Sequence, residues 1–442
     1  MTSSKKHPPL RIAIAGLGTV GIGVIRLLDT NAALVSARAG RAIEVTAVSA
    51  RDGTRDRGVD LSTFAWEDDM TAMAARDDVD IVVELVGGVD GPALTLARKT
   101  LAAEKHFVTA NKAMVAHHGM ELARIAQDKG VALKFEAAVA GGIPVVKGLR
   151  EGAAANGIDT VYGVLNGTAN YILSTMESTG ADFTATLAEA QRLGYAEADP
   201  TFDIEGVDAA HKLAILASIA FGSALDFDHV ACEGISQVRA ADIAQADVLG
   251  YVVRLVGTAE IDRSQDGADR ALLQQVRPCL VPKSHPLAHI TGATNAVVAQ
   301  GNFSGRLLFQ GAGAGDGPTA SAVVADLIDI ARGDRGPAFS IPVDALDTLP
   351  VADAGHHTGQ TYIRFSVADR PGVLAELTAA MRDAGVSIES LIQHGRASDG
   401  GEVLVAMVTH DGPQRCVARA VELLAESDSL TAPPLVMQLV ED

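Results

Sequence analysis

Short apolar runs alternate with amphipathic stretches over the first third of the chain. Strands are expected at LRIAIAG (10–16), AIEVTAVSA (42–50), DIVVELVGG (80–88), HFVTA (106–110) and VALKFEA (131–137). Helical periodicity covers 20–28, 92–103 and 111–129. Strands that alternate with helices in this way build βαβ units. The pattern therefore predicts an α/β fold with a Rossmann-like, doubly wound parallel sheet and helices on both of its faces.

The pattern changes at residue 136. Several helical stretches are followed by β-rich apolar runs at 251–261, 272–281 and 296–303, which is typical of an α+β domain. A glycine cluster then precedes a helical pattern at 318–333, which begins with Pro318, a residue favoured in the first turn of a helix. We expect this return helix to pack against the parallel sheet of the first part.

The C-terminal part has a self-contained pattern of its own, after the loose stretch VADAGHHTGQ (351–360). Strands are expected at TYIRFSV (361–367), SIESLIQHG (387–395), GEVLVAMVTH (401–410) and LVMQLVE (435–441), with helices at 372–383 and 414–426. The order βαββαβ predicts a ferredoxin-like domain.

Composition narrows the classes of protein that fit. Acidic residues outnumber basic ones by 55 to 36, and the formal net charge of −19 argues against a nucleic-acid partner. The three cysteines, Cys232, Cys279 and Cys416, have the spacing of neither a disulfide framework nor a zinc site. No apolar run is long enough for a membrane span or follows the N-terminal lysines as a leader would. We therefore expect a cytoplasmic chain with no membrane partner.

GLGTVG (16–21) follows the first strand and opens a helix, the context in which the G-x-G-x-x-G pattern indicates dinucleotide binding. The glycines allow a tight turn and let backbone amides approach a pyrophosphate at the positive end of the helix. The residues expected to hold the dinucleotide are Gly16, Leu17, Gly18, Thr19, Val20 and Gly21. The alternative is an ordinary glycine-rich turn that merely packs closely.

The second strand ends in Ser49, Ala50 and Arg51. An NAD-binding chain typically has an Asp or Glu there, which accepts hydrogen bonds from the ribose 2′-hydroxyl. An arginine can instead pair with a 2′-phosphate. The sequence therefore favours NADP, with NAD use left open, and a solvated surface arginine is the alternative.

Two further segments are expected at the carboxyl ends of strands, where ligands bind in doubly wound folds. TANK (109–112) closes a strand and starts a helix at Lys112. GAGAGDGPTA (311–320) places Gly311, Gly313 and Gly315 just before the return helix. Both segments face the cofactor in this interpretation, whereas a plain surface lysine and a flexible glycine joint are the alternatives.

GYAEADPTFDIEGVDAAHK (194–212) places five acidic residues just before the apolar run LAILASIAFG (213–222). Lys212 follows Asp208 by four residues and lies on the same helix face. A lysine at the edge of a buried run must be paired or have its pKa lowered by burial, which suits a group that transfers protons. The alternative is an ordinary ion pair that stabilises the helix by about 0.3–0.5 kcal/mol.

Five motifs in this order resemble homoserine dehydrogenase over roughly residues 10–340. They are GLGTVG, TANK, FEAAVAGGIP, GYAEADPTFDIEGVDAAHK and GAGAGDGPTASAV. The C-terminal unit, with DRPGVL (369–374) entering its first helix, resembles an ACT domain. The resemblance implies reversible NAD(P)H-dependent reduction of L-aspartate 4-semialdehyde to L-homoserine, a step towards threonine and methionine.

The resemblance also implies roles for individual residues. Lys212 and Asp208 are implied to be catalytic, and Lys112 is implied to lie beside both cofactor and substrate as a third catalytic candidate. Glu197 and Asp203 are implied to contact the substrate together with Asp208 and Lys212, because a substrate with an α-ammonium group requires carboxylates. Which lysine dominates proton transfer is left open.

The resemblance further implies a monovalent cation, sodium, in the FEAAVAGGIP segment. The ligands would be the Glu136 side chain and the backbone carbonyls of Val139, Gly141 and Ile143. An all-oxygen set suits a hard ion. From the sequence alone, Glu136 can equally be a strand-end charge that pairs with Lys134 or Lys147.

ACT domains commonly bind amino acids between paired copies, and for this pathway the expected effector is L-threonine. Ser387 stands where many ACT domains present Asn, so a dimerisation module without a ligand is the alternative. A homodimer or homotetramer is expected. Two other functions are alternatives: another ACT-containing dehydrogenase of amino-acid metabolism, and a non-catalytic amino-acid sensor.

These inferences divide the chain into four parts. Residues 1–135, completed by the helix at 318–333, are expected to bind the dinucleotide. Residues 136–317 are expected to form a catalytic and dimerisation domain. Residues 334–357 connect it to a regulatory domain at 358–442.

Overall fold

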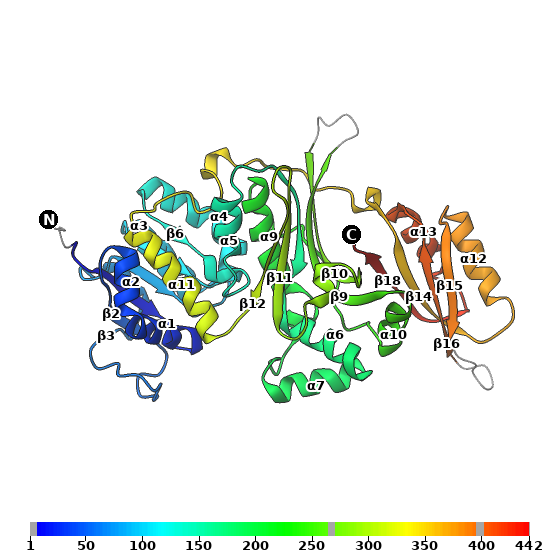
Figure 1. Cartoon of the computed structure of the whole chain (residues 1–442), viewed down its shortest axis with the longest axis horizontal. Helices are drawn as coiled ribbons and strands as arrows, with labels where there is room; N and C mark the ends of the chain where they lie inside the picture. The colour runs from blue at the N-terminus through cyan, green and yellow to red at the C-terminus, as the bar shows by residue number, and fades with distance from the viewer. Residues whose placement is uncertain (1–6, 264–269, 395–401, 442) are drawn as a thin grey trace.

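The computed structural model describes residues 7–263, 270–394 and 402–441. The chain forms three regions along its long axis, with the N-terminal parallel sheet at one end, the central mixed sheet in the middle and the C-terminal unit at the other end (Figure 1). Helix α11, from late in the chain, lies over the N-terminal sheet (Figure 1).

The N-terminal sheet is wholly parallel, with the strand order β3-β2-β1-β4-β5-β6. Its strands are β1 (Leu10–Ala15), β2 (Ile43–Ser49), β3 (Ala65–Trp66), β4 (Ile81–Glu84), β5 (His106–Thr109) and β6 (Leu133–Lys134). The order reverses direction between β1 and β4, which is the switch point where ligands bind in doubly wound folds. The predicted parallel sheet is confirmed.

Helices cover both faces of this sheet. They are α1 (Thr19–Thr30), α2 (Ala32–Ala39), α3 (Pro92–Ala102), α4 (Lys112–Lys129) and α11 (Asp316–Ala331), with a 3-10 turn η1 at Met70–Ala75. Ile12 and Ile14 pack in a core with α1 and α11, whereas Ala13 and Ala15 face the core that holds α3 and α4. The return helix therefore packs where it was predicted, although it begins two residues earlier. Neither α2 nor the two-residue β3 was predicted.

The central sheet is mixed and begins with the order β12-β11-β7-β9-β10, with β8 beside β10. Its strands are β7 (Ile158–Val164), β8 (Ala231–Cys232), β9 (Tyr251–Arg263), β10 (Arg270–Pro282), β11 (Thr294–Gly301) and β12 (Gly305–Ala312). The strand predicted at 296–303 ends earlier, because residues 302–304 turn the chain into β12. Strand β7 was not predicted.

Helices of the central region pack on one face of this sheet. They are α5 (Val145–Lys147), α6 (Gly167–Thr179), α7 (Phe183–Leu193), α8 (Thr201–Ile204), α9 (Val207–Phe221) and α10 (Ala240–Val248). Short turns lie at η2 (Glu136–Ala138), η3 (Gly148–Gly152), η4 (Pro286–His289) and η5 (Val343–Ala345). Helix α9 contacts β7, β9 and α4, so it lies between the two sheets. Its apolar residues 213–217 are all buried.

The C-terminal unit has the predicted βαββαβ order. Its elements are β14 (Thr361–Ala368), α12 (Val373–Asp383), β15 (Ile388–His394), β16 (Glu402–Thr409), α13 (Gln414–Leu424) and β18 (Leu430–Leu439). A turn η6 (Ala354–His356) and a small ladder of β13 (Thr358–Gly359) with β17 (Gly412–Pro413) join it to the rest. The predicted ends of two strands, at 395 and 401, lie outside the described residues.

The prediction that this unit is self-contained is wrong. Strand β18 pairs in parallel with β10 through Cys279–Gln438 and Leu280–Leu439, so both sheets form one ten-stranded sheet. The last strand also starts at Leu430 rather than 435. The two prolines at 433–434, which cannot donate hydrogen bonds, lie in a bulge of the strand rather than before it.

Among the described residues, no single helix has the length and apolar composition needed to cross a membrane. Helices α1 and α2 meet that test only as a pair, and the pair is bent by 85°.

Candidate active site

The three glycines of the 16–21 loop differ in what surrounds them. A Cβ on Gly16, which has φ of 105°, would lie 2.6 Å from the Leu85 carbonyl oxygen. A Cβ on Gly21 would lie 2.0 Å from the Gly16 oxygen, so glycine is needed for the turn and for helix packing. A Cβ on Gly18 would meet no described protein atom within 4 Å. Gly18 therefore borders open space at the strand end, where a dinucleotide phosphate is expected.

Helix α1 begins directly after this loop without a side-chain cap and without an acidic residue in its first turn. The amide N–H groups of Thr19, Val20 and Gly21 belong to the helix end that carries partial positive charge. These amides can donate hydrogen bonds to an anionic phosphate.

Two arginines lie beyond the end of β2. Arg51 is exposed, and it makes no ion pair or side-chain hydrogen bond with the described part of the chain. Arg57 was not predicted, yet its Nε donates to the Leu17 carbonyl oxygen at 3.1 Å and its Nη2 donates to that of Asp52 at 2.7 Å. The Arg57 guanidinium is thus held against the glycine loop. The sequence contains no sign of this position beyond the long polar loop that follows β2.

The ends of β4 and β5 set the position of Lys112. The buried Glu84 carboxylate accepts hydrogen bonds from the Val86 and Gly87 amides at 2.7 and 2.9 Å and from the Thr109 hydroxyl at 2.6 Å. Asn111 then caps α4, because its side-chain oxygen accepts a hydrogen bond from the Met114 amide at 3.0 Å. Lys112 follows as the first residue of that helix.

Two predicted lysines meet on one buried carboxylate. Lys112 Nζ lies 2.9 Å from Asp208 Oδ1, and Lys212 Nζ lies 2.7 Å from Asp208 Oδ2. Lys212 also donates to the Leu165 carbonyl oxygen at 2.7 Å. Lys112 comes from α4, and Asp208 and Lys212 come from α9, so the cluster joins the N-terminal and central regions.

Asn166 is a member of this cluster that was not predicted. Its side-chain amide donates to Asp203 at 2.7 Å and to Asp208 at 2.8 Å, and its oxygen caps α6 by accepting from the Ala169 amide at 2.7 Å. An Asn that directly precedes a helix is a recognisable cap. Asn166 was not recognised as one because strand β7, which leads into it, was not predicted from the sequence.

The pKa values of the three charged residues in the cluster shift in different directions. Burial is the main cause that lowers the pKa of Lys212, and the neighbouring Lys112 charge adds to it, although Asp208 opposes both. Burial also disfavours charge on Lys112, but the Asp208 carboxylate outweighs it and raises the pKa of Lys112. Burial opposes ionisation of Asp208, yet the two lysines hold its pKa below the usual range. Lys212 is therefore the lysine that is easier to deprotonate.

Two more predicted carboxylates lie near Lys112. The charges of Asp203 and Glu197 both help to raise the pKa of Lys112. Glu197 is exposed on the loop after α7, whereas Asp203 is half-buried in α8. One exposed and one half-buried carboxylate thus lie close enough to Lys112 to influence its charge.

The Glu136 segment was predicted to hold a cation. Glu136 is buried, and its carboxylate accepts hydrogen bonds from the Val146 and Lys147 amides at 3.0 and 2.9 Å. Burial, with a contribution from Asp326, raises its pKa to about 7. Among the described residues, neither Lys134 nor Lys147 forms an ion pair with Glu136, because Lys134 bonds Asp334 and Lys147 bonds Asp326 and Asp329.

The backbone of the same segment offers oxygen atoms. Ala140 and Gly141 both have φ of 54°, which turns successive carbonyls in a left-handed bend. In the described part of the chain, no hydrogen bond ends on the carbonyl oxygens of Val139 or Gly141, whereas that of Ile143 accepts from the Val145 amide at 2.7 Å. The donor chemistry therefore fits a hard cation.

This segment packs tightly against the chain before α11. A Cβ on Gly141 would lie 2.5 Å from the Gly313 oxygen, and a Cβ on Gly142 would lie 2.6 Å from Pro318. Gly315, with φ of 128°, is the residue before α11. The glycine cluster therefore forms a close joint between the two regions rather than a loose one.

Family profiles match most of the chain. A profile described as homoserine dehydrogenase matches residues 144–328. Profiles described as the NAD binding domain of homoserine dehydrogenase and as an ACT domain match residues 16–136 and 361–415.

Individual relatives agree with these matches. A homoserine dehydrogenase of Pseudomonas aeruginosa is 43% identical over 431 residues, which covers 96% of this chain and 97% of the relative. The crystal structure of a homoserine dehydrogenase from Thiobacillus denitrificans gives a TM-score of 0.91 at 40% identity and covers 99% of both chains. A hyperthermophilic archaeal homoserine dehydrogenase in complex with NADPH gives a TM-score of 0.63 at 25% identity and covers 74% of this chain and 98% of the archaeal one.

Proposed function

This chain belongs to the homoserine dehydrogenase family, and we propose that its buried Lys212 transfers the proton in the reaction of that family. The resemblance found in the sequence is confirmed. The chain is an NAD(P)-dependent oxidoreductase that interconverts L-aspartate 4-semialdehyde and L-homoserine. The observation that carries the proposal is the cluster in which Lys112 and Lys212 both form ion pairs with Asp208, and in which burial lowers the pKa of Lys212.

The nicotinamide of the cofactor supplies the hydride in this reaction when it is bound. Negative charge then develops on the aldehyde oxygen, which must receive a proton. The Lys212 ammonium has three N–H bonds, of which two are directed to Leu165 and Asp208, so one remains for the substrate oxygen. In the reverse direction the neutral amine accepts the proton of the alcohol, and the lowered pKa increases that neutral fraction.

The other charged residues have supporting roles in this proposal. Asp208 holds both lysines in place, and Lys112 keeps its positive charge beside the reacting oxygen. Glu197 and Asp203 accept hydrogen bonds from the substrate α-ammonium group. Asn166 fixes Asp203 relative to Asp208 through one amide nitrogen.

One assay tests the reaction and its regulation. NADPH absorbance is expected to fall when L-aspartate 4-semialdehyde is added to the purified chain, and to fall more slowly when L-threonine is also present. A chain that only senses amino acids would leave NADPH unchanged. A rate that is indifferent to saturating L-threonine would contradict L-threonine as the effector.

We place the effector and the subunit contact in the ACT domain. The supporting observations are the left-handed Gly372, with φ of 97°, at the entry to α12, and the Ser387 hydroxyl, which lies 3.3 Å from His410 Nδ1 in the loop before β15. Pairing of two such domains requires a homodimer or homotetramer. Sedimentation velocity that shows a monomer at working concentration would contradict this assembly.

We propose NADP as the preferred cofactor, because Arg51 and Arg57 follow β2 and the strand does not end in the Asp or Glu that is typical of NAD-binding chains. Arg51→Ala is expected to raise the KM for NADPH by about tenfold or more and to leave the KM for NADH within about twofold, since only NADPH has a 2′-phosphate. Arg57→Ala serves as the comparison, because loss of its bond to Leu17 should weaken both cofactors. Equal loss of both cofactors in Arg51→Ala would contradict the assignment.

We propose that Glu136 and the carbonyls of Val139, Gly141 and Ile143 hold sodium. The ion would stabilise the joint between the N-terminal and central regions, since this segment packs on Gly313 and Pro318. Exchange of sodium for choline is expected to lower both the melting temperature and the activity, and Glu136→Gln is expected to remove the dependence on sodium. A melting temperature that is equal in both salts would contradict the proposal.

A further inference from the structure

A polar cavity of about 440 Å³ lies on the face of the central sheet that is turned away from α9. Its floor comes from residues paired across neighbouring strands: Thr160 pairs with Glu260, and Thr258 pairs with Gln275. Their side chains share one face, because alternate strand residues point the same way. The roof is the connecting segment around His357, and Gln438 of β18 closes one side. The volume is that of a small-molecule site.

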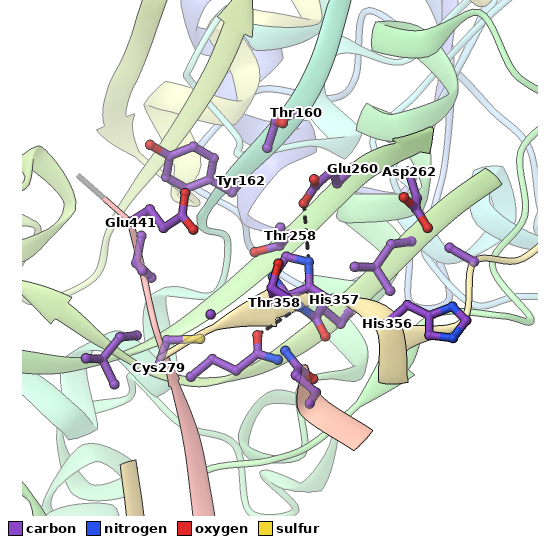
Figure 2. A pocket seen from close by; sticks show the side chains of 18 of the residues that line it. Thr160, Tyr162, Thr258, Glu260, Asp262, Cys279, His356, His357, Thr358 and Glu441 are labelled. Carbon is purple, nitrogen blue, oxygen red and sulfur yellow. Dashed lines mark hydrogen bonds and ion pairs between the residues drawn. The ribbon is translucent and has the colours of Figure 1, made fainter. Parts of the chain in front are cut away.

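The residues that line the cavity include four with carboxylates, Glu260, Asp262, Asp353 and Glu441, and one with a guanidinium group, Arg306. Figure 2 shows the Glu260 carboxylate directed towards the His357 ring. Glu441 and Tyr162 line the same cavity. Glu260 Oε2 lies 3.9 Å from His357 Nδ1. Burial is the main cause that raises the pKa of Glu260, His357 opposes it, and the Asp262 and Glu441 charges add to the rise. A ligand with a positive group would relieve this repulsion.

Two buried amides supply a second, independent sign of a ligand. Gln275 and Gln438 are only 3% and 8% exposed, and Gln275 Nε2 donates to Gln438 Oε1 at 3.1 Å. Gln275 Oε1 and Gln438 Nε2 are then buried without a hydrogen-bond partner. Exchanging oxygen and nitrogen in both amides still leaves one donor and one acceptor unpaired. A buried polar group without a hydrogen-bond partner destabilises the fold, so such groups usually have a partner.

We propose that this cavity binds a free α-amino acid. Its ammonium group would bond Glu260 and the unpaired amide oxygen of Gln275. Its carboxylate would bond the unpaired amide of Gln438 and His357. A zwitterion satisfies all of these groups, whereas a simple diamine leaves the donors unpaired.

The position of the cavity links it to the C-terminal unit. The His357 carbonyl accepts a hydrogen bond from the Gln414 amide, at the start of α13, at 2.9 Å. Gln438 is also one of the two residues of β18 that pair with β10. A ligand here would therefore contact the central sheet, the connecting segment and the C-terminal unit together. This site goes beyond the proposed function and is separate from the paired-ACT interface.

Isothermal titration calorimetry on the full chain tests the proposal. The probes are the proteinogenic amino acids one at a time, their N-acetyl forms, and 1,4-diaminobutane. We expect saturable binding of at least one free amino acid and no binding of its N-acetyl form. Glu260→Gln is expected to weaken that binding by about tenfold or more, since it removes the negative charge that pairs with the ammonium group.

Two matched variants make the result decisive. Glu189→Gln removes an exposed carboxylate of α7 and should not change the binding. Ser387→Ala alters the proposed ACT site, so it should affect only a binding event that Glu260→Gln leaves intact. The proposal is overturned by no saturable binding up to about 10 mM, by unchanged binding in Glu260→Gln, by loss only in Ser387→Ala, or by binding of the diamine alone. Calorimetry needs no turnover, so an inactive wild-type chain would refute the reaction without refuting this site.

Discussion

Lys212→Met is expected to lower kcat for semialdehyde reduction by about 10²- to 10⁴-fold, which is the usual contribution of a positioned acid or base. Binding of NADPH, followed by fluorescence titration, is expected to stay within about twofold, because the glycine loop lies on other elements. The reason applies to Lys212 rather than Lys112, since burial lowers the pKa of Lys212, whereas burial of Lys112 is outweighed by Asp208, which raises the pKa of Lys112. An outcome with near-normal turnover would remove Lys212 from the mechanism.

The variant is expected to fold, so the loss can be assigned to chemistry. Asp208 keeps hydrogen-bonding partners in Lys112 at 2.9 Å and Asn166 at 2.8 Å, so its buried charge is not left unpaired. Lys99→Met, at an exposed lysine of α3, is the control and should keep full activity. Partial recovery of Lys212→Met by added small amines would show directly that an amine is the missing group.

Gly18→Ala is expected to raise the KM for NADPH by about 10- to 100-fold with almost no loss of stability. The backbone of Gly18, with φ of −79° and ψ of −162°, suits any residue, and an added Cβ meets no described protein atom within 4 Å. The methyl group would instead stand in the space that a pyrophosphate must approach. Steady-state kinetics and thermal unfolding together measure the two effects.

Gly21→Ala is the matched comparison, because its Cβ would lie 2.0 Å from the Gly16 oxygen. This substitution is expected to destabilise the fold itself by about 1–3 kcal/mol, as overpacking does. If Gly18→Ala binds NADPH as tightly as the wild type, the loop does not hold the dinucleotide. If it unfolds as readily as Gly21→Ala, the space beside Gly18 is part of the packing.

The parts of the fold with strong periodicity could be predicted from the sequence. The parallel sheet followed from apolar runs that alternate with helices, and the return helix followed from a glycine cluster before Pro318. Strand β7 was missed because its seven residues, IDTVYGV, mix polar and apolar positions and lack an uninterrupted apolar run. Asn166, which directly precedes α6, was missed with it.

The candidate site shows the same division. Asp208 and Lys212 share a helix, so their spacing alone predicted the pair that the structure contains. Lys112 lies on a different helix, and the sequence could not show that it reaches the other oxygen of the same carboxylate. The position of Arg57 depends on the path of a long loop, which has no periodicity to interpret. Spacing within one helix could therefore be interpreted from the sequence, whereas contacts between distant segments could not be predicted from it.

The pairing of β18 with β10 has a consequence for how the chain is made. Strand β10 (Arg270–Pro282) emerges from the ribosome long before β18 (Leu430–Leu439). At about 5–20 residues per second, the part of the β10 edge that pairs with β18, at Cys279 and Leu280, therefore remains uncovered for many seconds of synthesis. An open strand edge invites pairing with other chains. Nascent copies translated side by side are thus most vulnerable to mispairing in the interval before β18 is made.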